Sequence, residues 1–333
     1  MKTESAARPL SPGPIMEMAT AFQRSRTLLT GFELGVFTAV ADEWRTSAEV
    51  AAAIGAEERS TDRLMNALAA LELLEKQAGR FRNAPLAATF LVKGRPGYLG
   101  GLGHTNDLWD TWSRLTPVVR EGHPAGIGET SERRDEWLRP FIAAMHARAK
   151  PSAPAVVSML DLDGVSRVLD VGGGSGAYAM AFVRARRGIA AVVFDLPQVV
   201  PLTRMYAAQE GMAAEVGTVA GNYLEDPLGE GFDLVFMSAV IHSNSPDANR
   251  RLFRKAARAL GPRGQLVVQD FLMDEDRSGP VWPALFALNM LVGTPEGDTY
   301  TESEVRTWMA EAGFGAIRRL DTPVGTNLVV GRL

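Results

Sequence analysis

A glycine-rich turn between an apolar segment and a helix is the feature that most constrains the fold of this chain. The segment 168–171 (Val-Leu-Asp-Val) predicts a buried strand, residues 172–176 (Gly-Gly-Gly-Ser-Gly) predict a tight turn, and Ala177 begins a helix. Because glycines carry no side chain, a ligand can approach the bare backbone amides at the N-terminus of that helix. From about residue 165 onward, short apolar segments alternate with helical patterns, which favours βαβ units and a parallel sheet.

Acidic residues near this turn indicate the class of ligand. The spacing from Gly172 to Ala177 satisfies the loose dinucleotide fingerprint, which is weak on its own. The apolar segment 190–194 ends in Asp195, at the distance where an acid meets the two hydroxyls of a ribose. Nicotinamide dinucleotides and S-adenosylmethionine both contain that ribose. Asp170, just before the turn, would oppose a pyrophosphate but suits the ammonium group of a methionine moiety.

A third expected strand, 215–220, ends at a short polar segment. Gly221, Asn222 and Tyr223 follow that strand directly. The Asn222 amide could hydrogen-bond an adenine amine, and the Tyr223 ring could stack on adenine.

Taken together, these motifs resemble those of class I S-adenosylmethionine-dependent methyltransferases. More narrowly, they are similar to the small-molecule O-methyltransferases of the plant caffeate and acetylserotonin type and of bacterial antibiotic tailoring. The Asp-Leu-Pro at 195–197 is a fairly specific mark of that group, whereas the glycine motif alone is not. The resemblance implies an α/β fold with a Rossmann-like seven-stranded sheet. The resembling segments are 168–177, 194–197, 221–223 and 232–242, and later strands are expected at 233–238, 265–270, 315–321 and 327–330.

The first half of the chain contains a module that predicts a winged helix. Thr46 caps a short helix that ends at Gly55, and a second helix begins near Ser60 or Thr61. A hairpin turn follows at 77–80. The second helix is expected to carry a leucine stripe at positions 64, 68, 71 and 74.

The charge of this module argues against DNA binding and favours dimerisation. Residues 59–76 carry three basic and three acidic side chains, so the expected reading helix is neutral and offers little attraction to phosphates. The apolar segment 18–40 has more apolar surface than one amphipathic helix needs, and a partner chain is a natural cover for it. The resemblance likewise implies an N-terminal, mainly helical winged-helix dimerisation domain and a homodimer.

A histidine just past a central strand is the candidate general base. The strand 232–238 is followed by His242, at the carboxyl edge where open α/β sheets bind ligands. Histidine, with an unperturbed pKa near 6.5, suits removal of a phenol proton. The resemblance implies that His242 is the base and that Asp270, at the end of the next strand, holds it. From the residues alone, His242 could equally satisfy a loop hydrogen bond, and Asp270 could cap a helix or lie at the surface.

Several positions depart from the family pattern. The family usually has His-Asp-Trp, where this chain has His242, Ser243 and Asn244. Asn222 replaces a common aspartate at the adenine position. Thr299, beside Asp298, stands where plant members place a second acid. These departures put the support of the base, and any plant-like substrate, in question.

The resemblance implies S-adenosylmethionine as the cofactor and an apolar pocket for the methyl acceptor. The expected cofactor-binding residues are Asp170, Gly172, Gly174, Gly176, Asp195, Leu196, Gly221, Asn222, Tyr223 and Ser238, the last standing where plant members have a lysine. The expected acceptor residues are Phe141, Met145, His146, Trp282, Phe286, Asn289 and Met290, with Trp109 and Trp112 nearby.

Composition excludes other classes of protein. The chain has no cysteine, which excludes disulfides, thiolate metal sites and cysteine nucleophiles and fits a reducing cytoplasm. The histidines at 104, 123 and 146 have no metal-like spacing with carboxylates, so we expect no metal site. A net charge of −4, no long apolar run and no signal-peptide pattern predict that neither nucleic acid nor membrane is a partner.

The sequence thus predicts a cytoplasmic, homodimeric S-adenosylmethionine-dependent O-methyltransferase that acts on a hydroxyl of a small aromatic or polyketide-like metabolite. N- or C-methylation or another reaction on the same fold, and a winged-helix regulator that binds the cofactor as a ligand, remain alternatives. The expected parts are a disordered N-terminus (1–14), a dimerisation domain (15–120), a linker helix and substrate-pocket segment (121–160) and a cofactor-binding domain (161–333). Within the third part we expect a helix over 134–149, which Pro151 and Pro154 stop.

Overall fold

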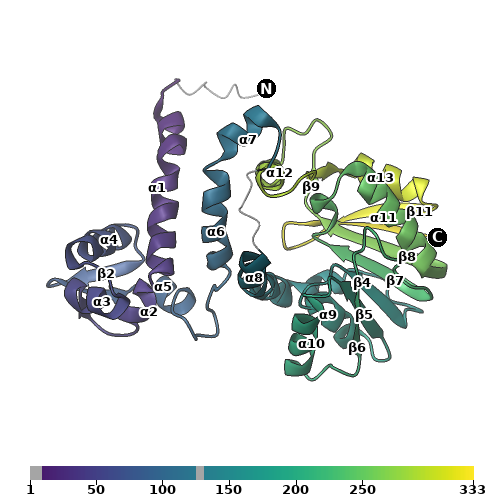
Figure 1. Cartoon of the computed structure of the whole chain (residues 1–333), viewed down its shortest axis with the longest axis horizontal. Helices are drawn as coiled ribbons and strands as arrows, with labels where there is room; N and C mark the ends of the chain where they lie inside the picture. The colour runs from purple at the N-terminus through teal and green to yellow at the C-terminus, as the bar shows by residue number, and fades with distance from the viewer. Residues whose placement is uncertain (1–9, 125–130) are drawn as a thin grey trace, which may run out of the picture. The chain divides into compact units, whose positions relative to one another are not determined.

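A computed structural model describes residues 10–124 and 131–333, without the side chains of 131–137. The chain divides into two compact units, one ending at Asn106 and one beginning at Asp107 (Figure 1). This division lies earlier than residue 120, where we expected the first domain to end. Of the expected disordered segment 1–14, residues 1–9 lie outside the described part, and helix α1 begins at Gly13.

The first unit contains the expected winged helix. Thr46 and Glu49 form a reciprocal capping box at the start of α3, and the hairpin between β2 and β3 turns at Ala78 and Gly79, which both have positive φ. The three strands form an antiparallel sheet in the order β1-β3-β2. The elements that begin in this unit are α1 (Gly13–Glu33), α2 (Val36–Val40), β1 (Arg45–Thr46), α3 (Ser47–Ile54), α4 (Glu58–Ala70), β2 (Leu74–Gln77), β3 (Arg80–Asn83), α5 (Pro85–Phe90) and α6 (Leu102–Trp112).

The leucine stripe of the second helix is shorter than its spacing predicts. Helix α4 begins at Glu58, where the Glu57 side chain accepts hydrogen bonds from two backbone amides, and it ends at Ala70. Glu72 has a φ of 61°, a left-handed conformation that no helix continues through. Leu74 therefore lies in strand β2 rather than on the helix, although it is still buried.

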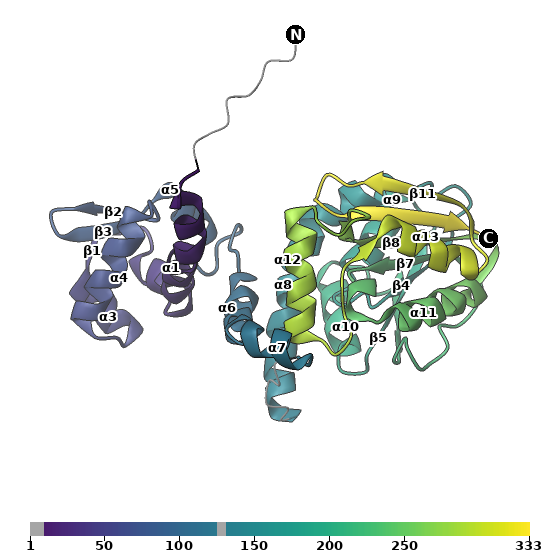
Figure 2. The same ribbon diagram turned by 90° about the horizontal axis from the view of Figure 1, so that it is seen from above.

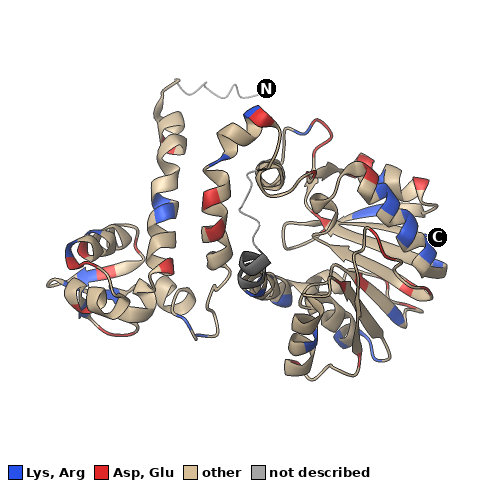
Figure 3. Cartoon of the chain, viewed as in Figure 1, with Lys and Arg blue, Asp and Glu red and all other residues tan. Residues whose placement is uncertain are grey.

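The charges of this first unit are mixed, as the sequence indicates. Basic and acidic segments alternate over its helices and strands (Figure 3). In the hairpin, Arg80 pairs with Glu49 and Arg82 with Glu75. On α1, apolar side chains are instead strongly exposed, with Ile15 at 71 % and Met18 at 80 %.

The second unit is built on a seven-stranded sheet in the order β11-β12-β8-β7-β4-β5-β6. Strand β12 is antiparallel to both neighbours and the other pairs are parallel, which confirms the predicted Rossmann-like sheet and its terminal hairpin. The strands are β4 (Arg167–Val171), β5 (Ala190–Asp195), β6 (Val216–Ala220), β7 (Phe232–Ser238), β8 (Leu260–Asp270), β9 (Leu272–Met273), β10 (Tyr300–Thr301), β11 (Gly315–Asp321) and β12 (Asn327–Arg332). The helices are α7 (Leu115–Glu121), α8 (Ser131–Val157), α9 (Ala177–Ala185), α10 (Val200–Gln209), the 3-10 helix η1 (Ile241–Ser243), α11 (Pro246–Ala259), α12 (Val281–Gly293) and α13 (Glu302–Glu311).

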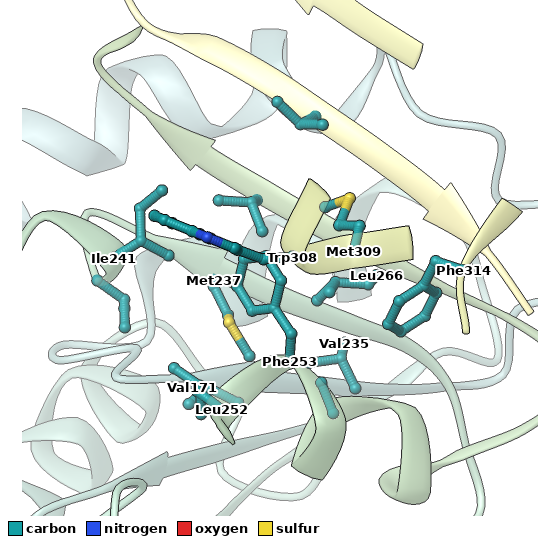
Figure 4. Packing of buried hydrophobic residues seen from close by; sticks show 14 of the residues in the cluster. Val171, Val235, Met237, Ile241, Leu252, Phe253, Leu266, Trp308, Met309 and Phe314 are labelled. Carbon is teal, nitrogen blue, oxygen red and sulfur yellow. The ribbon is translucent and has the colours of Figure 1, made fainter. Parts of the chain in front are cut away.

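Helices cover both faces of this sheet (Figure 2). Alternate residues of each strand face opposite sides. On one face, Val235 and Met237 pack against side chains of α11 and α13, such as Phe253 and Trp308 (Figure 4). On the other face, alternating residues of the same strands pack against α8 and α9. Because both faces are buried there, the central strands such as β4 and β7 are nearly continuous apolar runs, as parallel sheets require.

Helix α8 runs farther than its prolines predict. It extends to Val157 and contains Pro140, Pro151 and Pro154, whereas we expected the helix to stop at Pro151. Its C-terminal part is apolar, since Ala153 and Val156 are fully buried against α9. This packing outweighs the backbone hydrogen bonds that the prolines remove.

Candidate active site

The glycine turn lies between β4 and α9, where the strand order of the sheet reverses. Gly172, Gly174 and Gly176 have φ values of 66°, 56° and 76°, which side chains disfavour. A Cβ atom on Gly173 would lie 2.6 Å from the carboxyl group of Asp170. Open α/β sheets bind ligands at such a reversal, so the turn is placed for a cofactor.

Asp170 lies beneath this turn and is 1 % exposed. Its Oδ2 accepts a hydrogen bond from the backbone N–H of Ala179, and its Oδ1 is buried with no partner among the described atoms. Burial raises the pKa of this carboxyl to about 7, and the nearby charge of Asp195 adds to the increase. A buried acceptor without a partner suits a cationic donor, and the ammonium group of S-adenosylmethionine is one.

Asp195 ends β5 directly beside the turn. Its Oδ2 accepts from the N–H of Gly174 at 2.7 Å, and its Oδ1 accepts from the N–H of Leu196 at 2.7 Å. Burial raises the pKa of this carboxyl, while the two backbone hydrogen bonds oppose the increase. A carboxylate held at this edge can accept hydrogen bonds from a ribose diol, as the sequence predicts.

Asn222 and Tyr223, the residues expected to contact adenine, both make hydrogen bonds within the protein. The Asn222 oxygen, which we expected to accept from the adenine amine, already accepts from the N–H of Leu224. The Tyr223 ring lies close to Gly172, and its hydroxyl donates to Oδ1 of Asn244 at 3.2 Å. Gly221 is required, since a Cβ there would lie 2.5 Å from the Phe194 ring. Tyr223 thus lies beside the turn and is also tied to the segment that carries the candidate base.

His242 and Asp270 form a buried pair. Nδ1 of His242 lies 2.7 Å from Oδ1 of Asp270, and the two residues are 8 % and 3 % exposed. The same Oδ1 accepts from the N–H of Phe271 at 2.9 Å, which fixes the carboxylate. A carboxylate at Nδ1 stabilises the tautomer with its proton on Nδ1, so Nε2 is left as an acceptor. The geometry is that of an oriented general base.

A buried hydrogen-bond network that was not predicted from the sequence fixes the segment around His242. The Asn244 side chain donates to Asn249, whose own amide donates to the carbonyl of Ile241 at 2.9 Å. The Tyr300 hydroxyl donates to the carbonyl of Asn244. Asn249 is fully buried within α11. A residue with poor helix propensity among apolar positions was the one signal in the sequence for such a role.

Among the side chains that the structure describes, Asp270 is the one acid that contacts His242. Thr299 is fully buried and donates to the carbonyl of Pro283, and the Asp298 carboxylate pairs with Arg277. The backbone N–H of Asp298 instead donates to the carbonyl of His242 at 2.9 Å. The segment after α12 therefore supports the base through its backbone.

Three aromatic rings, which we call the aromatic cluster, lie beside the base: Phe271, Trp282 and Phe286. Phe286 is edge-on to His242 with ring centroids 4.9 Å apart, and it contacts both other rings. Oδ1 of Asn289, one turn farther along α12, accepts from Nε1 of Trp112 at 2.9 Å. This bond leaves the amide N–H donors of Asn289 for another acceptor.

The other predicted residues are spread around this edge. His146 stacks on Tyr206, and its Nδ1 lies 2.9 Å from Oγ of Ser175 in the glycine turn, so it faces the expected cofactor rather than the aromatic cluster. Burial lowers the pKa of His146. Ser238 donates to the side chain of Gln269. Phe141 and Met145 are half-buried on α8, and Met290 is buried on α12.

Within the described ranges, no group of three or more His, Asp or Glu side chains could hold a metal ion. Over the same ranges, no helix is long and apolar enough to cross a membrane.

Comparison with known proteins gives matches over nearly the whole chain. The model of the O-methyltransferase domain matches residues 112–315, and that of the O-methyltransferase dimerisation domain matches residues 16–93. The chain is 34 % identical to 3-hydroxy-5-methyl-1-naphthoate 3-O-methyltransferase of Streptomyces sahachiroi, over 96 % of this chain and 95 % of that one. It is 31 % identical to the tetracenomycin polyketide synthesis 8-O-methyl transferase TcmO of Streptomyces glaucescens, over 96 % of each. Human N-acetylserotonin methyltransferase in complex with S-adenosylmethionine superposes with a TM-score of 0.87 at 26 % identity, over 98 % of this chain and 99 % of that one.

Proposed function

The chain belongs to the O-methyltransferase family and is an S-adenosylmethionine-dependent enzyme. On this premise, we propose that it methylates a hydroxyl of an aromatic, polyketide-like metabolite and that His242 is the general base. The observation that carries the proposal is the buried pair of His242 and Asp270 beside the aromatic cluster. The names of two relatives, one an O-methyltransferase of a hydroxynaphthoate and one of tetracenomycin polyketide synthesis, support a flat aromatic acceptor.

The residues around the glycine turn fit S-adenosylmethionine. Asp195 is proposed to bind the ribose hydroxyls, and Asp170 the ammonium group. Tyr223, and the lone pair of the Asn222 oxygen that does not accept from Leu224, are proposed to contact the adenine. The bare amides of the turn allow the close approach that these contacts need. When bound, the cofactor supplies a methyl group on a positively charged sulfur.

The protein's own groups prepare the acceptor for transfer. The aromatic cluster packs against the acceptor ring, and the Asn289 amide donates to one of its oxygens. Nε2 of His242 accepts the proton of the hydroxyl, and Asp270 stabilises the imidazolium that results. A phenol with a pKa of about 10 is only ~0.1 % ionised at pH 7, so a base of this kind contributes typically ~10²- to 10⁴-fold. Orientation of the two reactants contributes further.

The match to the dimerisation domain supports a homodimer, and the match to the O-methyltransferase domain supports a small-molecule acceptor. We propose that the partner covers the exposed apolar side chains of α1, such as Ile15 and Met18. Light scattering on the purified chain should give twice the monomer mass. A monomer at micromolar concentration would contradict this assignment.

A thermal-shift measurement followed by a labelled-methyl assay tests the proposal. S-adenosylhomocysteine should raise the melting temperature, whereas NADH should not. Labelled S-adenosylmethionine should then transfer its methyl group to hydroxynaphthalenes in a panel of phenols, anilines and enols. Stabilisation by NADH alone, or label found only on nitrogen or carbon, would overturn the proposed reaction.

A further inference from the structure

An exposed arginine lies at the border of the aromatic cluster. The guanidinium carbon of Arg148, on α8, is 5.4 Å from the centroid of the Phe271 ring. Phe271 packs edge-on against Phe286, with ring centroids 4.9 Å apart, and Phe286 lies edge-on to His242. Successive ring contacts therefore connect this guanidinium group to the proposed base.

The charge of Arg148 has no acidic partner within the described part of the chain. By contrast, Lys150 of the same helix and Arg184 of α9 both form ion pairs with Glu210. The contact with the Phe271 ring positions the guanidinium group but does not neutralise it. A planar fork of N–H donors is thus left for an anion next to an apolar surface.

The contact with Phe271 places Arg148 on the side of α8 that faces the aromatic cluster. Met145, three residues earlier, lies on a neighbouring part of the helix surface. His146 lies on another flank, where it contacts Ser175 and Tyr206 on the expected cofactor side. Residues of one helix thus face both proposed reactants.

Resting on the proposed function, we propose that the acceptor is an aromatic hydroxy acid and that Arg148 binds its carboxylate. A guanidinium group and a carboxylate form two parallel hydrogen bonds, which fix orientation as well as distance. With the carboxylate held at Arg148 and the ring against the aromatic cluster, the hydroxyl is directed toward His242. Arg148 then determines both the charge and the orientation of the acceptor. In the alternative, the arginine stem only covers the Phe271 ring.

Matched acceptors separate these readings. The full-length enzyme is assayed with 3-hydroxy-1-naphthoate and with its neutral carboxamide, which has the same ring and hydroxyl. We expect Arg148→Gln to lower kcat/KM for the acid about 10- to 100-fold, mainly through KM, because it removes a charge-assisted hydrogen-bonded pair. The value for the carboxamide should stay unchanged, and Arg148→Lys should restore part of the loss with the acid.

Arg139 provides the matched control. It is also an exposed arginine of α8, but it lies nine residues away and therefore on the opposite flank. Arg139→Gln should leave both acceptors unaffected. Equal losses with acid and carboxamide, or no loss with either, would overturn the role of Arg148 and leave the proposed function standing. If the wild-type enzyme binds S-adenosylhomocysteine but methylates neither compound, the proposed acceptor class is wrong, and this inference falls with it.

Discussion

Replacing His242 by alanine tests whether this side chain removes a proton or only packs. Nε2 of His242 is the atom left to accept a proton, because Nδ1 lies 2.7 Å from Asp270. Without that acceptor, the enzyme can use only acceptor molecules that are already ionised. For a phenol with a pKa of about 10, this fraction is ~0.1 % at pH 7, so kcat should fall by up to about 10³-fold.

The pH dependence of this loss makes the test specific. The ionised fraction of a free phenol rises about tenfold for each pH unit below its pKa. The loss in His242→Ala should therefore shrink from about 10³-fold at pH 7 to about 10-fold at pH 9. Initial rates of labelled-methyl transfer at saturating acceptor, measured in half-unit steps of pH, give the profile.

Two controls separate chemistry from folding. The affinity for S-adenosylhomocysteine, measured by calorimetry, should change little in the variant, since His242 lies against Asp270 and Phe286 rather than in the glycine turn. His123→Ala removes an exposed histidine and should behave as wild type. A loss that is the same at pH 7 and pH 9 would refute proton removal by His242.

Three further predictions follow from the same contacts. Asp270→Asn should lower kcat by about 10²-fold or more with little change in cofactor affinity, because an amide does not hold the Nδ1–H tautomer or stabilise the imidazolium; unchanged kcat would make Asp270 a packing residue. Gly297→Ala should lower the free energy of unfolding, measured with urea, by about 1–3 kcal/mol and lower kcat as well, because a Cβ there would lie 2.5 Å from the carbonyl oxygen of His242; a variant as stable and active as wild type would contradict this. Burial raises the pKa of Asp170 to about 7. Between about pH 4 and 7, this carboxyl therefore binds a proton in the folded chain but not in the unfolded chain. Its contribution to the free energy of unfolding falls by up to about 1.4 kcal/mol per pH unit as pH rises through that window. Asp170→Asn should flatten the urea-derived stability profile between about pH 4 and 7, and an unchanged slope would refute the assignment.

Local signals were enough to predict the sheet and its cofactor edge. Apolar runs bounded by turn residues, together with the family resemblance, predicted the seven strands of the sheet but not the short strands β9 and β10, and the glycine turn predicts where the sheet binds a ligand. These signals succeed because a strand buried on both faces must be apolar throughout, and a turn approached by a ligand must lack side chains. Asp195 and His242 were singled out because one ends a strand and the other comes shortly after a strand, at the same edge of the sheet.

Features that depend on tertiary packing could not be predicted in this way. The prolines of α8 predicted a helix end at Pro151, but the burial of Ala153 and Val156 against α9 carries the helix onward. Likewise, the sequence places His146 next to Met145 without indicating which flank of the helix meets the glycine turn. Only the neighbouring elements decide such directions.

The departures from the family pattern at Asn244 and Thr299 become consistent when the two positions are considered together. Thr299 cannot supply a charge to the base, so Asp270 is the one carboxylate that contacts His242 within the described residues. The segment is fixed instead by neutral hydrogen bonds, from Tyr300 to the Asn244 carbonyl and from Asn249 to Ile241. Neutral groups cost less to bury than a second carboxylate. Tyr223, which bonds to Asn244 beside Gly172, ties the position of the His242 segment to the expected cofactor edge.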